Sequence, residues 1–127
     1  MEDDDFRSLS IIERRMLHAM ISTELPDGEI LIRQIDSSRV KAIDEVGSLK
    51  FSVSCDELYD DVSGPLITAQ QEDVDTVPGC GPYINFLLFL RDGVVDELEV
   101  YKDDGGRILS TFDPSKFALT WGLPPKK

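Results

Sequence analysis

Carboxylates are the chemically most distinctive residues of this chain, and they are concentrated in its middle third. Between Phe51 and Leu90 there is no lysine or arginine, whereas seven acidic residues occur there. These residues are Asp56, Glu57, Asp60, Asp61, Glu72, Asp73 and Asp75. Such a run creates a negative potential that attracts a positively charged partner and repels phosphate backbones. We interpret the seven acids as a contact region for a basic partner, the alternative being that they only keep the protein soluble.

A second group of acids lies on one predicted strand. Glu97 and Glu99 are two positions apart, so both carboxylates point to the same face of a sheet. Such a pair can supply the acid and base of glycoside hydrolysis, or it can belong to a solvated strand face. The predicted strand pairing places these acids among aliphatic and aromatic residues, as in the core and rim of a protein interface. We therefore expect a second binding surface formed by Phe86, Glu97, Glu99 and Tyr101.

The sequence offers few groups for nucleophilic or metal chemistry. His18 is the only histidine and lies on a predicted helix, so any Ser-His-Asp or Cys-His arrangement would depend on it. Cys55 and Cys80 lack the CxxC spacing of a zinc site, and we expect reduced thiols. We therefore expect no enzymatic activity, no metal site and no cofactor.

Length and charge restrict the class of protein further. A chain of 127 residues is expected to form one domain, with loosely structured ends at about residues 1–6 and 113–127. The net charge of −12 disfavours binding to nucleic acid or to anionic membranes. The acidic N-terminus does not resemble a secretory signal, and the longest apolar run, 86–90, is too short to span a bilayer. We expect a cytoplasmic protein.

Two helices are predicted at the beginning of the chain. Ser10 and Glu13 have the spacing of a capping box, and apolar residues follow at helical intervals as far as Ile21. Pro26 ends this helix, and Asp27-Gly28 is expected to form a turn and cap for a second, shorter helix over residues 29–35. The helices therefore precede all of the predicted strands.

The remaining sequence predicts a mostly antiparallel sheet of five or six strands. Residues 40–43 and 49–54 alternate as a hairpin, residues 65–69 begin a third strand, and residues 76–82 are expected to form a rigid loop. Asp92-Gly93 predicts a type I′ turn between strands 83–91 and 94–102, followed by a short strand over 107–109. The fold class is α+β, with two N-terminal helices packed on one face of the sheet.

The pairing across the Asp92-Gly93 turn predicts which side chains share a face. Counting back from a two-residue turn places Leu87 opposite Leu98, and Phe86 opposite Glu99. One face would then be mainly aliphatic. The other face would combine Ile84, Phe86 and Leu88 with Tyr101 and the two glutamates.

Four segments carry a resemblance to a family of small, acidic, uncharacterised bacterial proteins. The segments are Phe6-Arg7-Ser8-Leu9, Gly47-Ser48-Leu49-Lys50-Phe51, Leu88-Phe89-Leu90-Arg91-Asp92-Gly93 and Leu98-Glu99-Val100-Tyr101-Lys102-Asp103-Asp104-Gly105. In size, acidity and α+β layout the chain also resembles immunity proteins that neutralise bacterial toxins, including those of contact-dependent growth inhibition. The first resemblance implies no active residues, because none are assigned in that family. The second resemblance concerns the general type of protein and involves no shared motif.

These observations lead to two functional hypotheses. The first is a non-enzymatic immunity protein that binds a basic toxin domain, such as a nuclease, and occludes its active site. The second is a stand-alone regulatory or small-molecule-binding domain whose acidity serves solubility. The oligomeric state is left open by the sequence.

Overall fold

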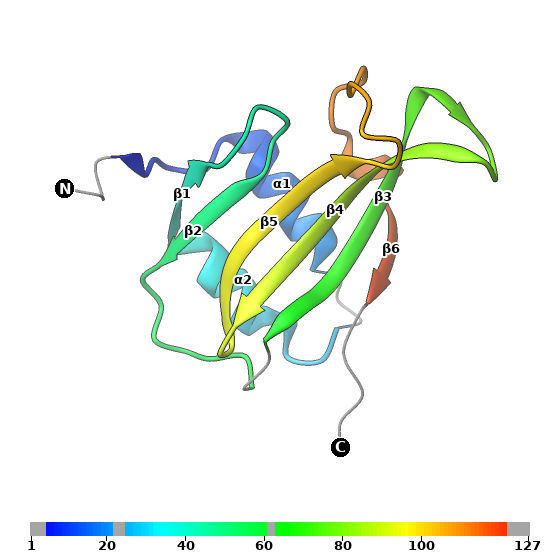
Figure 1. The fold of residues 1–127 in the computed structure, drawn as a ribbon. Coiled ribbons are helices and arrows are strands. Elements are labelled where there is room, and N and C mark those ends of the chain that lie inside the picture. The colour runs from blue at the N-terminus through cyan, green and yellow to red at the C-terminus, as the bar shows by residue number, and fades with distance from the viewer. Residues whose placement is uncertain (1–4, 22–24, 61–62, 122–127) are drawn as a thin grey trace.

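The computed structural model describes residues 5–21, 25–60 and 63–121. Two helices are followed by six strands and one short 3₁₀ helix, which confirms the predicted α+β class (Figure 1). The elements are α1 (Ile11–Met20), α2 (Gly28–Asp36), β1 (Ser38–Ala42), β2 (Leu49–Val53), β3 (Gly64–Val77), β4 (Gly81–Arg91), β5 (Val94–Lys102), η2 (Pro114–Lys116) and β6 (Ala118–Trp121). Neither helix of the described chain has the length and apolar character needed to cross a bilayer.

The helix starts differ in how closely they follow the prediction. Ser10 caps α1 as expected, because its side chain accepts from the Glu13 amide while the Glu13 carboxylate accepts from the Ser10 amide. Asp27 is the N-cap residue of α2 as predicted, but its side chain forms no capping hydrogen bond. Its backbone is left-handed, with φ of 57°, and the residue serves as a turn before the helix.

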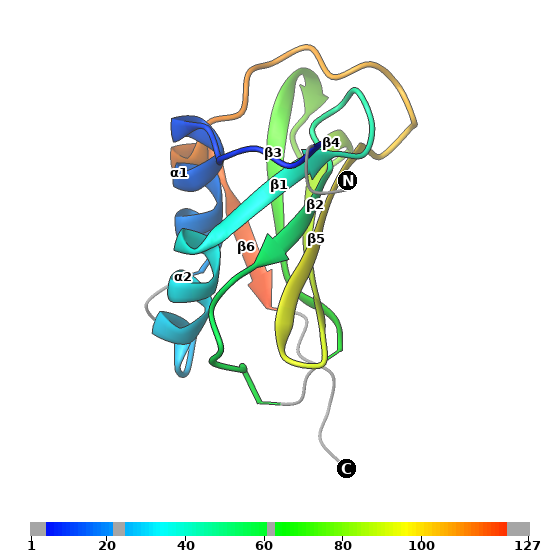
Figure 2. The same cartoon turned by 90° about the vertical axis from the view of Figure 1, so that its left-hand side faces the viewer.

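The six strands form one antiparallel sheet in the order β1-β2-β5-β4-β3-β6. The two helices lie on one side of this sheet, as Figure 2 shows. Apolar side chains of α1 and α2, among them Met16, Leu17 and Leu31, are buried against it. Within residues 5–21, 25–60 and 63–121, no helix lies over the opposite side of the central strands.

The central hairpin contains a β-bulge that changes the predicted faces. Phe89 pairs with Glu97, whereas its neighbour Leu90 pairs with Val95, so Asp96 is the extra residue on β5. Phe86 therefore lies opposite Val100, not Glu99. One inserted residue moves every later side chain of the strand to the other face. The predicted grouping of Phe86 with Glu97, Glu99 and Tyr101 was wrong.

Phe86 lies at the centre of the core between the sheet and the helices, with no exposed area. Its ring contacts two aromatic residues that follow β5 in sequence. The Phe112 ring lies at 5.0 Å in an edge-to-face arrangement, and the Phe117 ring lies at 4.8 Å. Residues 112–117 thus contribute to the core, because aromatic pairs of this geometry stabilise beyond the area they bury.

Two segments expected to be irregular or terminal have different structures. Residues 76–82 do not form a separate loop, because β3 continues to Val77 and β4 begins at Gly81. The β3–β4 hairpin therefore projects beyond the rest of the sheet as a two-stranded ribbon (Figure 1). Residues 114–116 and 118–121, predicted as a loose tail, form η2 and the edge strand β6. Residues 122–127 lie outside the described part. The expected strand over 107–109 is absent from the described structure, which has an irregular segment there.

Candidate functional site

The seven acids of the middle third do not form a common surface. Asp56, Glu57 and Asp60 lie in the connection after β2, whereas Glu72, Asp73 and Asp75 lie on β3 near its ribbon end. Figures 1 and 2 place these two segments at opposite ends of the sheet. Asp61 lies outside the described residues. The predicted contact region is therefore divided into two separate groups.

Ion pairs within the protein neutralise part of this charge. The Glu57 carboxylate accepts from both the Nε and a terminal nitrogen of Arg33, and the bonds to Arg33 lower the pKa of Glu57. Lys102 Nζ lies 2.8 Å from an oxygen of Asp73 and 2.8 Å from an oxygen of Asp75. Asp56, Asp60 and Glu72 are exposed and have no ion pair among the described residues.

Asp73 is a buried structural group. Its side chain has no exposed area, and it accepts from Lys102 Nζ, the Ser110 hydroxyl and the Leu109 amide. Burial by itself raises the pKa of this carboxyl, but the hydrogen bonds outweigh burial and hold the pKa far below its usual range. Asp73 stays ionised and is unavailable to a partner.

The bulge creates a different candidate surface on the side of the sheet away from the helices. We call it the open face and define it by five residues of the central hairpin. They are Leu87, Phe89, Glu97, Glu99 and Tyr101. Tyr101 is 42% exposed and the other four are half-buried. Glu97 lies directly across from Phe89, and Glu99 directly across from Leu87, so each carboxylate borders an apolar side chain.

Polar contacts delimit the open face at both ends. At one end Gln70 Nε2 donates to Asn85 Oδ1 at 3.0 Å, and Asn85 Nδ2 donates to Asp103 Oδ1 at 2.6 Å. At the other end the bulge residue Asp96 accepts from Lys50 Nζ at 2.9 Å. Neither Glu97 nor Glu99 forms an ion pair with a residue in the described part of the chain. The open face thus combines an apolar centre with two carboxylates that form no ion pair among the described residues, although Lys50 of β2 lies across from Glu97 and binds Asp96 instead.

Leu87 and Phe89 were not among the predicted binding residues. Assuming an unbroken alternation from the turn put them on the wrong side of the hairpin. One signal against this assumption is present, because buried Val95 and Leu98 are three positions apart while Leu98 and Val100 are two apart. A change from period two within a strand is typical of a β-bulge.

The side chains considered for catalysis or metal binding lie apart. His18 Nε2 is 2.9 Å from Asp36 Oδ1, which also accepts from Arg14. Both cysteines are free thiols, with Cys55 half-buried after β2 and Cys80 exposed at the tip of the β3–β4 ribbon. Within residues 5–21, 25–60 and 63–121 no group of three or more potential metal-ligating side chains occurs.

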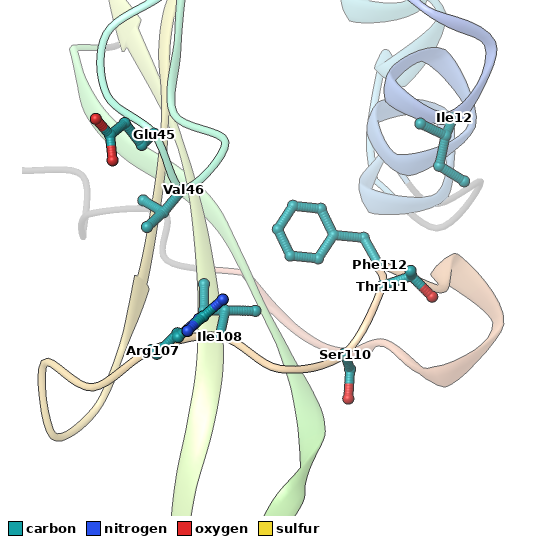
Figure 3. A pocket seen from close by; sticks show the side chains of 8 residues that line it. All are labelled: Ile12, Glu45, Val46, Arg107, Ile108, Ser110, Thr111 and Phe112. Carbon is teal, nitrogen blue, oxygen red and sulfur yellow. The ribbon is translucent and has the colours of Figure 1, made fainter.

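A groove of about 920 Å³ lies at the end of the molecule away from the β4–β5 turn. Figure 3 shows this groove from close by. It is lined by side chains from α1, the β1–β2 turn and the irregular segment after β5. These residues are Ile12, Glu45, Val46, Arg107, Ile108, Ser110, Thr111 and Phe112. No sequence motif predicts this groove, because its walls come from three segments that are distant in the sequence.

No family model, curated protein or solved structure matches the chain.

Proposed function

We propose that this chain is a non-enzymatic binding protein whose open face captures a basic protein. The observation that carries the proposal is the pairing of Glu97 and Glu99 with half-buried apolar neighbours, on a sheet face that no helix of the described residues covers. Aromatic and aliphatic groups supply most of the binding free energy in protein interfaces, and surrounding charges select the partner. Because Glu97 and Glu99 form no ion pair among the described residues, and Lys50 binds Asp96, their carboxylates favour a partner that presents lysine or arginine there.

The remaining negative charge supports the same class of partner. Asp56, Asp60 and Glu72 are exposed but lie outside the open face, so we assign them to long-range attraction instead of direct contact. With a net charge of −12 the protein attracts cationic surfaces over a distance set by the ionic strength. Such steering accelerates association more than it tightens the final complex. Nucleic acid is disfavoured as a partner for the same reason.

Within this class we propose an immunity protein that neutralises a basic toxin domain. An enzyme that cleaves nucleic acid must present positive surface to phosphate groups, and a small acidic protein can cover that surface. The type resemblance to immunity proteins, including those of contact-dependent growth inhibition, favours this assignment. Occlusion of the toxin's active site would need no catalytic group in this chain.

The test is a calorimetric titration against the product of the reading frame next to the gene for this chain. We expect binding at micromolar concentration or below in low salt, and at least about tenfold weaker binding when ionic strength rises from about 0.05 to about 0.5 M. Co-expression should restore the growth of cells that produce the toxin. Absence of binding at micromolar concentration in low salt would contradict the proposal.

A further inference from the structure

The groove of Figure 3 has an apolar surface whose central element is the Phe112 ring. Ile12 of α1, Val46 of the β1–β2 turn and Ile108 surround this ring. Ile12 is 43% exposed and Val46 is 39% exposed, although both belong to apolar residue types that folding normally buries. The groove volume of about 920 Å³ lies within the range of small-molecule sites in proteins.

The groove is held in place before any ligand arrives. Two buried side chains of β3 bind the segment that forms its wall, which we call the strap and define as residues 107–113. Gln71 donates to the Thr111 carbonyl at 2.9 Å and accepts from the Asp113 amide at 2.8 Å. Asp73 accepts from the Leu109 amide at 2.8 Å and from the Ser110 hydroxyl at 2.6 Å. Hydrogen bonds from Gln71 and Asp73 therefore hold four of the seven strap residues in place despite the irregular backbone.

The Phe112 ring is fixed from two further directions. It packs edge-to-face on Phe86 at 5.0 Å, and a Cβ placed on Gly47 would lie only 3.0 Å from its Cε2 atom. Figure 2 shows the strap passing over the end of the sheet towards α1, which brings Ile12 to the other side of the groove. Preorganisation of this kind reduces the entropy that a ligand must overcome on binding.

Arg107 indicates the chemistry of the ligand. Its guanidinium forms no hydrogen bond or ion pair with any residue that the structure describes, although the protein as a whole is strongly acidic. Arg107 lines the groove together with Ile108, whereas in Figure 3 the Glu45 carboxylate is turned outward, away from Phe112. A guanidinium at the edge of an apolar groove is suited to a planar anion with an apolar body, because it can bind a carboxylate through two hydrogen bonds.

We propose that this groove binds a small carboxylic acid with an apolar chain or ring, whose carboxylate pairs with Arg107 and whose apolar part contacts Phe112, Val46 and Ile12. The site is independent of the proposed immunity function, since it shares no residue with the open face. The guanidinium gives preference to the acid over its alcohol or amine counterpart.

The test is a titration of the ¹⁵N-labelled full chain with octanoate, octanol and octylammonium, followed by amide chemical shifts. Octanoate should give saturable shifts at Val46, Ile108 and Thr111 with a dissociation constant of about 1 mM, the order expected for ten non-hydrogen atoms. Octanol and octylammonium should bind at least about fivefold more weakly. The shift spectrum also reports whether each variant is folded.

Matched variants test the assigned roles. Arg107→Ala should weaken octanoate binding about tenfold. The control is Arg15→Ala, which should leave octanoate binding unchanged, because Arg15 is another exposed arginine that forms no ion pair in the described part of the chain. Val46→Asp should abolish binding, and Val74→Asp on the distant ribbon should not. Equal affinities for octanoate and octanol, an unchanged Arg107→Ala variant, or no saturable shift in the folded protein would overturn the proposal.

Discussion

The Lys102 amine shows how burial decides the role of an acidic residue. It lies 2.8 Å from both Asp73 and Asp75, so geometry alone makes the two ion pairs equal. The Asp73 side chain has no exposed area, whereas that of Asp75 is 47% exposed. Water screens the second pair but not the first, and a buried ion that loses its countercharge is strongly destabilising.

We therefore predict that Asp73→Asn and Asp75→Asn differ in stability although each removes one charge next to the same amine. Asp73→Asn should lower the free energy of unfolding by about 3 kcal/mol, because a buried cation loses its fully buried partner. Asp75→Asn should lower it by less than about 1 kcal/mol. Urea unfolding of the two variants measures the difference, and equal effects would show that Asp73 is not a structural group.

The lowered pKa of Asp73 also predicts a pH dependence. A carboxyl whose pKa is lower in the folded state stabilises the protein above its unfolded pKa of about 4, and this contribution is lost as pH falls. Stability should therefore decrease progressively below about pH 5. In Asp73→Asn the number of protons taken up on unfolding in acid should be smaller by roughly one. The measurement is the unfolding midpoint of the natural chain and of Asp73→Asn, followed from neutral to acid pH. An equal slope of midpoint against pH for the two proteins would contradict this account.

The position of Asp73 also shows why charge runs are hard to interpret from sequence. Ala69, Gln71 and Asp73 alternate on β3 and all three are buried, so the acid continues a core-facing pattern. The sequence predicts a buried Asp73 only if the third strand is expected to extend past residue 72. Gln71 and Asp73 form hydrogen bonds with residues 109–113, some forty positions away, and no local signal predicts these bonds.

At the scale of elements, the β4–β5 turn is the best example of local sequence deciding structure. Asp92 and Gly93 have φ of 52° and 81°, as the type I′ turn requires, and β5 spans Val94–Lys102 as predicted. The turn is also packed against other elements. Gln34 of α2 donates to the Gly93 carbonyl at 2.9 Å, and the Tyr59 amide donates to the same oxygen at 2.8 Å. Gly93 therefore joins α2 and the connection after β2 to the central hairpin.

This packing predicts different outcomes for two glycines with the same backbone conformation. Gly93 and Gly79 both have φ of 81°, but a Cβ on Gly93 would lie 2.5 Å from the Asp60 carbonyl oxygen, while one on Gly79 meets nothing within 4 Å. Gly79→Ala should cost only the left-handed backbone penalty of about 1 kcal/mol. Gly93→Ala should cost about 1–3 kcal/mol more, since a backbone atom must move.

Thermal or urea unfolding of both alanine variants provides the comparison. If the two variants lose equal stability, the close approach of Asp60 to the turn does not exist in solution.

The elements that could be predicted are those fixed by neighbouring residues. Ser10 and Glu13 define the start of α1, and Asp92-Gly93 defines the hairpin, because both depend on contacts only a few positions apart. Strand β6 depends on pairing with β3, some fifty positions earlier, whereas the Asp96 bulge and the ribbon are pairings between nearby residues that depart from a regular two-residue alternation. The open face follows from the bulge, so only Glu97, Glu99 and Tyr101 were found in advance.

At the scale of the whole molecule, negative charge is spread over separate regions. Arg33 and Lys102 form ion pairs with three of the acids in the middle third, and the remaining exposed acids lie at opposite ends of the sheet. Long-range attraction depends on the total charge of −12, while the contact itself depends on where unpaired carboxylates meet apolar surface. In the structure this combination occurs on the open face.

The central claim is that the open face is the contact surface for a basic protein. The most direct measurement compares Glu97→Lys/Glu99→Lys with Asp56→Lys/Asp60→Lys in titrations against the same basic protein encoded beside this gene. Both double variants change the net charge by the same amount, and only the first changes the open face. We predict about 100-fold weaker binding for the first and less than about fivefold for the second. Equal losses, or a larger loss for the second, would contradict the account.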